Sequence, residues 1–402
     1  MSNSLLTISM ITREAIRLFK NSNAFLMSID RQYDDSFAQV GAKIGSQLRI
    51  RLPNDFTVRT GQAASVQDTA EQQTTLTLAT QKGVDVSFTG ADLALSLDDF
   101  SERILAPMIN NLAGAVAADV MSGSTAIANY VSLVDGSNNT LTPTAATWLL
   151  AGANLDNNSA PRGKRKIVLD PLTMARTVDS LKGLFNPQAG LSKQYESGEM
   201  YSALGFDWMM DQTILKTTAG SFSAGTVNGA GQTGNTITVN AITGTLNVGD
   251  IITFAGVNQV NRVTKQTTGT LRQFVVTAPV ASSGTSISIY PALIPASGSN
   301  QVQYQTVTAS PANSATISLV QKASETTRKN IAFRPEAVTL ATADLPLPRG
   351  THEVARGVFD SISMRMISDY IIATDQMLTR LDVLYGYLWV RPEWAVNIMD
   401  AI

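Results

Sequence analysis

The side chains that most often carry acid–base or metal chemistry are nearly absent from this chain. Histidine occurs once, as His352, and cysteine does not occur among the 402 residues. The absence of cysteine excludes disulfides, zinc fingers, iron–sulfur sites and cysteine nucleophiles. A hydrolase would have to build a Ser–His–acid triad on His352, which follows Pro346, Pro348 and Gly350 in what we interpret as a loop. We therefore expect no catalytic residue, no cofactor and no metal site.

Two other patterns have the form of a reactive or ligand-binding motif. Asp98, Asp99 and Glu102 are spaced like paired carboxylates, but capping and the helix dipole already explain acids where a helix begins. Residues 229–234 fit the G-x-G-x-x-G nucleotide pattern, but β-like residues 236–239 follow where a helix is required. We interpret this segment as a flexible loop. The chain has no Walker A motif, which argues against nucleotide hydrolysis.

The only dense basic segment covers residues 162–166, and contact with phosphate is physically reasonable there. We interpret it instead as a solvated turn before a strand. The chain has 30 Lys and Arg against 32 Asp and Glu, and this balance argues against a strongly basic nucleic-acid binder. No apolar run approaches the roughly 20 residues of a membrane helix, and residues 1–20 lack the design of a cleaved signal. We expect neither membrane insertion nor export.

The first elements along the chain need a neighbouring surface. Apolar residues recur at helical spacing over residues 8–19, which predicts a short amphipathic helix in an N-terminal arm. Residues 48–52 alternate strictly between apolar and charged, and a second alternating segment covers 74–78. About twenty polar residues separate the two segments, too many for a compact hairpin. The pattern predicts an extended two-stranded ribbon, which is marginally stable alone.

A long helix and an α+β region follow the ribbon. Apolar residues at three-to-four spacing predict a helix over about 98–121. Pro107 lies inside this pattern and predicts a kink one turn above it. A strand over 166–169 and a helix over 171–184 then complete the region.

The sharpest boundary in the chain is a change in charge density. The 105 residues from 217 to 321 contain four charged side chains, whereas the other 297 residues hold the remaining 58 (62 − 4). Short β-rich runs within this stretch predict a small all-β barrel or sandwich inserted into a mixed domain. Further strands predicted after the insert should return to the sheet of the first domain. The four charges are Asp250, Arg262, Lys265 and Arg272; the runs are 236–239, 250–254, 274–277 and 286–290, and the later strands 361–366, 381–390 and 394–399.

Six segments, in their order and spacing, resemble one known family. The resemblance is to the major capsid (coat) proteins of short-tailed, podovirus-type tailed bacteriophages, and it extends from about residue 30 to residue 399. In that family the shell subunit has the Johnson fold with an inserted β-barrel domain. The segments are Gln32–Phe37 (QYDDSF), Leu48–Pro53 (LRIRLP), Leu97–Arg103 (LDDFSER), Val248–Val257 (VGDIITFAGV), Thr379–Gly386 (TRLDVLYG) and Arg391–Glu393 (RPE).

The resemblance implies an α+β fold, the tailed-phage major capsid fold, with an all-β inserted domain over residues 216–325. It also implies an N-terminal arm over 1–30 and two capsid-fold parts, 31–215 and 326–402, the second completing the axial domain and its sheet. The first part would hold an extended loop, a spine helix, and peripheral and axial elements. The loop is expected over about 46–90 and the spine helix over about 96–123.

The implied function is structural. Such a chain self-assembles through pentamers and hexamers into the icosahedral phage head that encloses double-stranded DNA. The implied partners are copies of the chain itself, a scaffolding protein, a portal protein, packaged double-stranded DNA bound non-specifically on the inner face and, in some phages, a decoration protein. The implied location is the virion, after assembly in the cytoplasm of the host bacterium.

Three segments are expected to carry assembly contacts. In a ring of copies the ribbon would lie over the spine helix of the next subunit, bury its apolar side there and place its arginines near the acidic helix start. A kink in the spine helix would suit rigid-body rotation during procapsid maturation. The loop 228–235 is uncharged where related inserts carry a charged loop, so it would reach a neighbouring capsomer through hydrogen bonds alone. The residues concerned are Leu48, Arg49, Ile50, Arg51, Arg59, Leu76, Leu78, Asp98, Asp99, Glu102, Pro107, Asn228, Gln232 and Asn235.

Three alternatives remain open on the sequence. A β-rich tail fibre or adhesin that binds surface glycans would explain the Gly/Thr/Ser-rich insert and predicts monomers or trimers. A hydrolase predicts that His352→Ala abolishes an activity. An encapsulin-like cellular shell protein shares the shell fold and predicts an enclosed cargo enzyme and no portal.

Overall fold

The computed structural model divides the chain into two compact units. Unit 1 comprises Met1–Arg51, Gln73–Val120 and Val338–Val390, and unit 2 comprises Leu52–Gln72, Met121–Ala337 and Arg391–Ile402. The described residues are 12, 15, 17–19, 23–33, 46–56, 58, 61–64, 66, 72–89, 106–135, 139–181, 200, 202–297, 302–359, 361–374 and 376–402.

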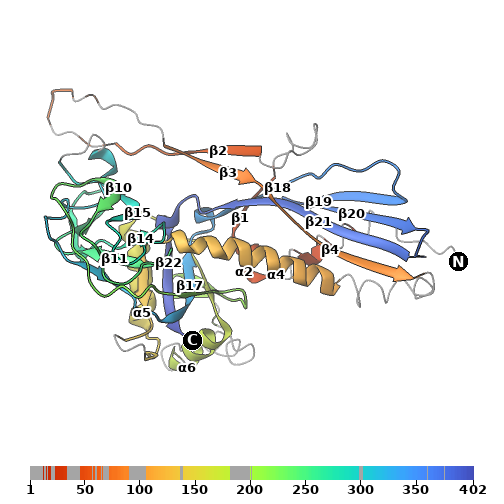
Figure 1. Ribbon diagram of the computed structural model, residues 1–402, viewed down its shortest axis with the longest axis horizontal. Coiled ribbons are helices and arrows are strands. Elements are labelled where there is room, and N and C mark those ends of the chain that lie inside the picture. The colour runs from red at the N-terminus through yellow and green to blue at the C-terminus, as the bar shows by residue number, and fades with distance from the viewer. Residues whose placement is uncertain are drawn as a thin grey trace. The chain divides into compact units, whose positions relative to one another are not determined.

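Unit 1 is built on a sheet organised around one long strand, β21. This strand pairs antiparallel with β20, β4 and β18, while β19 extends the sheet beyond β20 and β1 joins β18 in parallel. Figure 1 shows β19, β20, β21 and β4 running side by side. The strands predicted over 361–366 and 381–390 are confirmed. The bounds are β1 Asp30–Tyr33, β4 Thr80–Thr89, β18 Thr339–Ala343, β19 Glu353–Phe359, β20 Ile362–Ile371 and β21 Gln376–Leu388.

Two further elements of unit 1 are the predicted ribbon and the long helix. The ribbon is confirmed: β2 (Ser46–Leu52) and β3 (Gln72–Leu78) form a two-stranded sheet. The helix is described as α4 (Ala106–Ser122), and its buried residues follow the predicted three-to-four spacing. A short helix, α2 (Ala24–Ser28), is capped by Asn23, whose side-chain oxygen accepts from the backbone N–H of Leu26.

Polar side chains tie α4 to the sheet of unit 1. The Asp119 carboxylate pairs with Lys82 of β4 at 2.7 Å and accepts the hydroxyl of Tyr385 of β21 at 2.5 Å. Burial, followed by the hydrogen bond to Asp119, raises the pKa of Tyr385, so the phenol stays protonated. The indole nitrogen of Trp389 donates to the carbonyl of Val120 at 3.0 Å. These bonds fix the helix against the sheet.

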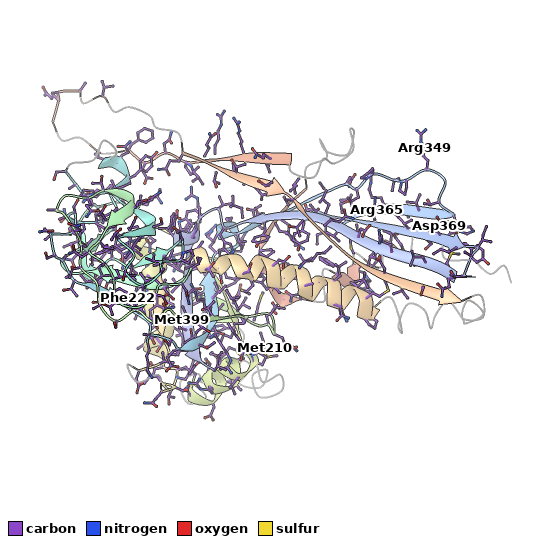
Figure 2. All side chains as sticks on the ribbon, in the orientation of Figure 1. Met210, Phe222, Arg349, Arg365, Asp369 and Met399 are labelled. Carbon is purple, nitrogen blue, oxygen red and sulfur yellow. The ribbon has the colours of Figure 1, made fainter. Side chains whose placement is uncertain are left out.

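Unit 2 has three layers, with a mixed sheet of order β5-β22-β17-β6-β8-β7 in the middle and β9 paired to β17. Successive side chains of a strand point to opposite faces, so alternate residues of β22 pack into two different apolar clusters. Val396 and Ile398 pack with helices α5 and α6, whereas Met399, labelled in Figure 2, packs against Ile251 and Val275 of the insert. The bounds are β5 Tyr130–Ser132, α5 Ala145–Asn157, β6 Lys166–Leu169, α6 Pro171–Leu181, β7 Ser202–Ala203, β8 Phe206–Met210, β9 Leu215–Thr218, β17 Thr326–Phe333 and β22 Ala395–Ala401.

The insert is an all-β barrel with one contiguous apolar core. Its antiparallel strands follow the order β10-β15-β14-β11-β16, and β12 pairs with β13. Residues 224–228 close the barrel, because Asn228 N–H donates to Thr238 O at 3.0 Å and Val227 N–H to Ala315 O at 2.9 Å. The four predicted β-rich runs are confirmed as strands. The bounds are β10 Gly234–Thr238, β11 Ile251–Phe254, β12 Asn258–Val260, β13 Thr267–Leu271, β14 Phe274–Val276, β15 Ser286–Leu293 and β16 Ile317–Leu319.

Candidate assembly interface

The apolar side of the ribbon is covered by its own chain. Leu76 and Leu78 of β3 are 0% and 2% exposed and belong to a core cluster with residues of β18 and β21. Leu48 and Ile50 of β2 are half-buried and pack against the same cluster. The expectation that a neighbouring subunit must cover these positions is therefore corrected for Leu76 and Leu78, whereas Leu48 and Ile50 keep part of their surface open. The sheet of unit 1 supplies the apolar surface that the ribbon needs.

The ribbon approaches this sheet backbone to backbone at one glycine. A Cβ on Gly386 of β21 would lie 2.2 Å from the carbonyl oxygen of Thr77 and 3.2 Å from a methyl carbon of Leu76. Real Cβ atoms do not come this close to backbone, so the residue at position 386 must be glycine for β3 to lie where it does. Gly386 thus fixes the position of the ribbon within unit 1.

The opposite side of the ribbon is polar and open to solvent. Arg49 and Arg51 of β2 are exposed, as are Gln73, Thr75 and Thr77 of β3. The two strands form a sheet of their own among the described residues, so each has one edge without a partner strand. Arg59 and the acidic residues expected to face these arginines, Asp98, Asp99 and Glu102, lie outside the described residues.

The turn that follows β2 is held by the insert. The Asp55 carboxylate accepts from Arg262 Nε at 2.6 Å, and Asn54 Oδ1 accepts the hydroxyl of Tyr304 at 3.2 Å. A second nitrogen of Arg262 lies 3.3 Å from the carboxylate of Glu393. Burial would lower the pKa of Arg262, but its two carboxylate partners outweigh burial and raise it. These pairs hold residues 54 and 55 against the insert within unit 2.

Two apolar side chains close to these pairs have no such cover. Phe56 and Val58 are 63% and 97% exposed. The ribbon turn therefore presents apolar surface directly beside a set of fixed charges.

A buried charge lies where the insert meets the middle sheet of unit 2. Lys329 of β17 is 0% exposed, and its ammonium donates to the carbonyl oxygen of Gly249 at 3.0 Å. Burial lowers the pKa of Lys329 to about 8, against which the nearby Asp250 carboxylate acts to raise it. Gly249 has φ +90°, and a Cβ there would lie 2.8 Å from the lysine nitrogen, so both the backbone and the space call for glycine.

Asp250 is held at the same junction by backbone donors. Its carboxylate accepts from the N–H groups of Gly220 at 2.9 Å and Asn247 at 2.8 Å. Burial raises the pKa of Asp250, while these hydrogen bonds and Lys329 act to lower it. The contact thus ties the start of the insert, near residue 220, and the turn before β11 to Lys329 of β17.

The uncharged loop of the insert is organised by its own glutamine. The side-chain amide of Gln232 donates to the carbonyls of Asn228 at 2.7 Å and Thr238 at 2.9 Å, and its oxygen accepts from the Thr238 N–H at 2.6 Å. These bonds use the amide within the chain, and a contact of Gln232 with a neighbouring capsomer stays a prediction. Asn228 and Asn235 are exposed.

Pro107 is the second residue of the described helix α4. The kink predicted one turn above it falls on residues 101–105, which lie outside the described residues. The N-terminal arm is described only in part: residues 12, 15 and 17–19 are helical, with Ala15 and Phe19 buried. These positions agree with the amphipathic helix predicted over 8–19.

The motifs considered for chemistry lie in separate parts of the fold. His352 is exposed, and its backbone N–H lies 3.4 Å from a carboxylate oxygen of Asp369, labelled in Figure 2. In the basic segment, Arg162 and Lys164 are exposed, as expected for a solvated turn, whereas Arg165 is buried and pairs with Asp156 at 2.6 Å directly before β6. The loop 229–234 runs into strand β10 rather than a helix. Among the described residues there is no acidic or histidine cluster that could hold a metal and no helix suited to span a membrane.

Comparisons with known proteins point to phage shells. The family model described as P22 coat protein, gene protein 5, matches residues 3–399. The I-domain of the CUS-3 coat protein is 30% identical and covers 27% of this chain and 96% of its own, with a TM-score of 0.19. A search of the curated proteins found no match.

Two larger solved structures span most of the chain. A chain of Mycobacterium phage Che8 is 11% identical over 94% of this chain and 90% of its own, with a TM-score of 0.46. A chain of the capsid of cyanophage P-SCSP1u is 12% identical over 94% of this chain and 89% of its own, with a TM-score of 0.48. The family model carries the assignment, because it spans nearly the whole sequence. The chain therefore belongs to the P22 coat protein family and is a phage coat protein that forms the shell of the head.

Proposed function

We propose that this chain is the major capsid protein of a short-tailed phage and that it assembles through pentamers and hexamers into an icosahedral head around double-stranded DNA. The observation that carries the proposal is the ribbon β2–β3. Its apolar side is covered within unit 1, its polar side is exposed, and each strand has an unpaired edge among the described residues. A ribbon held in this way is prepared to lie against a neighbouring copy, because open strand edges require cover.

The sequence features of the chain extend this proposal to named parts. The arm over 1–30, the loop over about 46–90, the spine helix over about 96–123 and the insert over 216–325 correspond to the parts of such a subunit. Rotation of subunits about the spine helix would accompany maturation, with Pro107 as a bending point. Pro107→Ala should then change the shape or the expansion of procapsids, and unchanged expansion kinetics would remove this role.

The proposed contact of the ribbon is electrostatic. Arg49 and Arg51 would meet the acidic helix start, Asp98 to Glu102, of the next copy in the ring. Each exposed pair contributes about 0.2–1 kcal/mol, but a closed ring repeats the pair in every copy. Assembly should weaken with added salt, and the variant Arg49→Ala with Arg51→Ala should assemble less and lose the salt dependence. Thr75→Ala with Thr77→Ala on the same exposed side is the matched control. Equal assembly of the arginine variant at low and high salt would contradict the contact.

The loop 228–235 is proposed to meet a neighbouring capsomer through Asn228, Asn235 and backbone groups. Neutral hydrogen bonds are little affected by salt, so this contact should persist at high ionic strength. Deleting residues 229–234 should give shells that dissociate at lower denaturant concentration. Shells of unchanged stability would exclude the contact.

The further partners proposed are a scaffolding protein, a portal protein, packaged DNA and, in some assemblies, a decoration protein. The net charge of −2 supports weak, non-specific contact with DNA. The family assignment does not favour the alternatives of a glycan-binding tail fibre, a hydrolase or a cellular compartment.

The test of the proposal is assembly of the purified chain. Size-exclusion chromatography and negative-stain electron microscopy should reveal pentamer and hexamer rings or closed shells, with or without a scaffold from the same phage. Persistent monomers or trimers in the presence of scaffold would contradict the proposal and favour a binding protein.

A further inference from the structure

Helix α5, labelled in Figure 1, is apolar around nearly its whole circumference. Its inner face packs on the middle sheet of unit 2 through Trp148, Ala151 and Leu155, each 0% exposed. Up to Leu155 the helix has no charged residue, and the Asp156 carboxylate is bound by arginines 162 and 165. A helix of this composition is found with both faces covered.

The outer face of α5 is nevertheless exposed. Ala146, Leu149, Leu150 and Ala153 recur at the spacing of one helix side, and we refer to these four residues as the α5 stripe. Leu149 and Leu150 are 54% and 53% exposed. The α5 stripe contains no hydrogen-bonding side chain, so a nucleic acid or a charged peptide gains nothing from it.

The size of the α5 stripe indicates how it is used. A helix of this length is about 20 Å long. One side of it offers a few hundred Å² at most, below the roughly 800 Å² per partner that a stable complex of two chains buries. Such a contact is too small to hold two subunits together alone, but it is sufficient when it is repeated around a closed ring of copies. The coat protein assignment supplies such rings.

The same unit has a second, smaller exposed apolar patch, on a side of α6 that also carries Asp179 and Arg176, the latter paired with Asp400. Leu172 of α6 is 52% exposed, and Ala175, one turn along the same side, is also exposed. Helix α5 connects β5 to β6, and α6 follows β6 toward β8, so the helices lie in one layer but over different parts of the sheet. A ring requires two different patches on each subunit, one for each neighbour. The two helices provide such a pair.

We propose that, within a capsomer, the α5 stripe of one copy is covered by Leu172 and Ala175 on α6 of the next copy. This inference rests on the proposed assembly into rings. The contact is apolar, so it differs from the ribbon contact in that salt does not weaken it.

The test uses the absence of cysteine from the natural chain. The double variant Leu149→Cys with Leu172→Cys is assembled into shells and oxidised. Disulfides between different copies should then give a ladder of covalent oligomers on a denaturing gel, from dimers up to the complete capsomer. Each single variant should stay monomeric on the gel. No ladder, or dimers from Leu149→Cys alone, would overturn the proposal.

A second variant does not depend on disulfide geometry. Leu149→Gln with Leu150→Gln changes residues that are exposed in the subunit, so the thermal midpoint of the subunit should be unchanged. The protein concentration at which shells first form should rise about tenfold or more, because each ring contact loses two leucines. Leu271→Gln, at a 43% exposed leucine of the insert, is the matched control and should assemble normally. Normal assembly of the α5 variant would overturn the proposal.

Two outcomes separate this inference from the proposed function. If the unmodified chain forms no rings or shells, the proposed function fails before the α5 stripe is tested. If it does form shells, labelling of Leu149→Cys by a maleimide should be blocked in the shell and free in the subunit. Protection that ends when the scaffold leaves the shell would assign the α5 stripe to the scaffold and overturn the proposal.

Discussion

Replacing Lys329 with methionine removes a buried charge while keeping a side chain of similar length. In the folded protein the pKa of Lys329 is about 8, against an ordinary value of 10.5. The difference is about 2.5 (10.5 − 8), and each pKa unit corresponds to about 1.4 kcal/mol. Keeping the ammonium charged in this position therefore costs about 3 kcal/mol at pH 7. Because the lowered pKa already includes the attraction of Asp250, we expect Lys329→Met to be more stable than the natural chain at pH 7, by this amount less the contribution of the hydrogen bond to Gly249 that the variant loses.

The sign of the pH dependence follows from the same two values. Between pH 8 and 10.5 the unfolded chain holds a proton on Lys329 that the folded chain does not, so the free energy of unfolding rises with pH in this window. The penalty is present in full below pH 8 and is gone above 10.5. The advantage of the methionine variant should therefore fall from about 3 kcal/mol at pH 7 toward zero at pH 10.5.

The assay is urea unfolding followed by tryptophan fluorescence at several pH values. Trp148 and Trp208 of unit 2 are in edge contact, with ring centroids 4.9 Å apart, so they report on the unit that contains Lys329. The difference between variant and natural chain cancels the titration of groups that do not interact with Lys329; Asp250 does interact with it, so the comparison is made at pH 7 and above, away from the usual titration range of a carboxyl group. Lys322→Met, at an exposed lysine, is the control, and its effect should be within about 0.5 kcal/mol at every pH. A methionine variant that is less stable at pH 7, or a difference that does not change with pH, would refute the reasoning.

Three further predictions concern the ribbon and the insert loop. Gly386→Ala should lower the stability of unit 1 by about 1–3 kcal/mol and speed hydrogen exchange in β3, because the added Cβ meets the backbone of Thr77. Gly114→Ala in α4, where a Cβ meets nothing within 4 Å, is the control and should be neutral or stabilising. Equal effects of the two variants would contradict the close approach. Arg262→Met should free the Asp55 segment, seen as faster exchange over residues 52–56; unchanged exchange would mean that the ion pair does not hold the turn. Gln232→Ala should release the loop 228–235, measured by its amide exchange, with little change in overall stability, and a fully protected loop would contradict this.

The local elements could be predicted from the sequence because each has its own period. The alternation at 48–52 and 74–78 identified both strands of the ribbon, and the three-to-four spacing identified the part of α4 that is described. The alternation does not indicate which surface covers the apolar side of the ribbon. Leu76 and Leu78 are covered by β18 and β21, more than 250 residues later in the chain, so only the tertiary fold reveals that no neighbour is needed.

The few charged residues of the charge-poor stretch 217–321 are a sequence signal for the fixed contacts of the insert. Residues 217–321 contain four charged side chains, and three of them interact with groups outside this stretch: Asp250 lies near Lys329, Arg262 pairs with Asp55 and Glu393, and Arg272 donates to Asn158 at 3.1 Å. Because burying a charge is costly, a charge kept in a charge-poor module marks a fixed contact. By contrast, nothing in the sequence indicates which way the Gln232 amide turns, since its partners are backbone groups of its own loop.

The measurement that tests the central claim most directly is a cryo-electron microscopy reconstruction of particles assembled from the full chain with its scaffold. A coat protein of this family should form closed icosahedral shells in which each copy sits in a pentamer or hexamer, with the polar side of the ribbon, including Arg49 and Arg51, lying against the spine helix of the next copy. Particles without closed symmetry, or shells in which the ribbon contacts no other copy, would contradict the account.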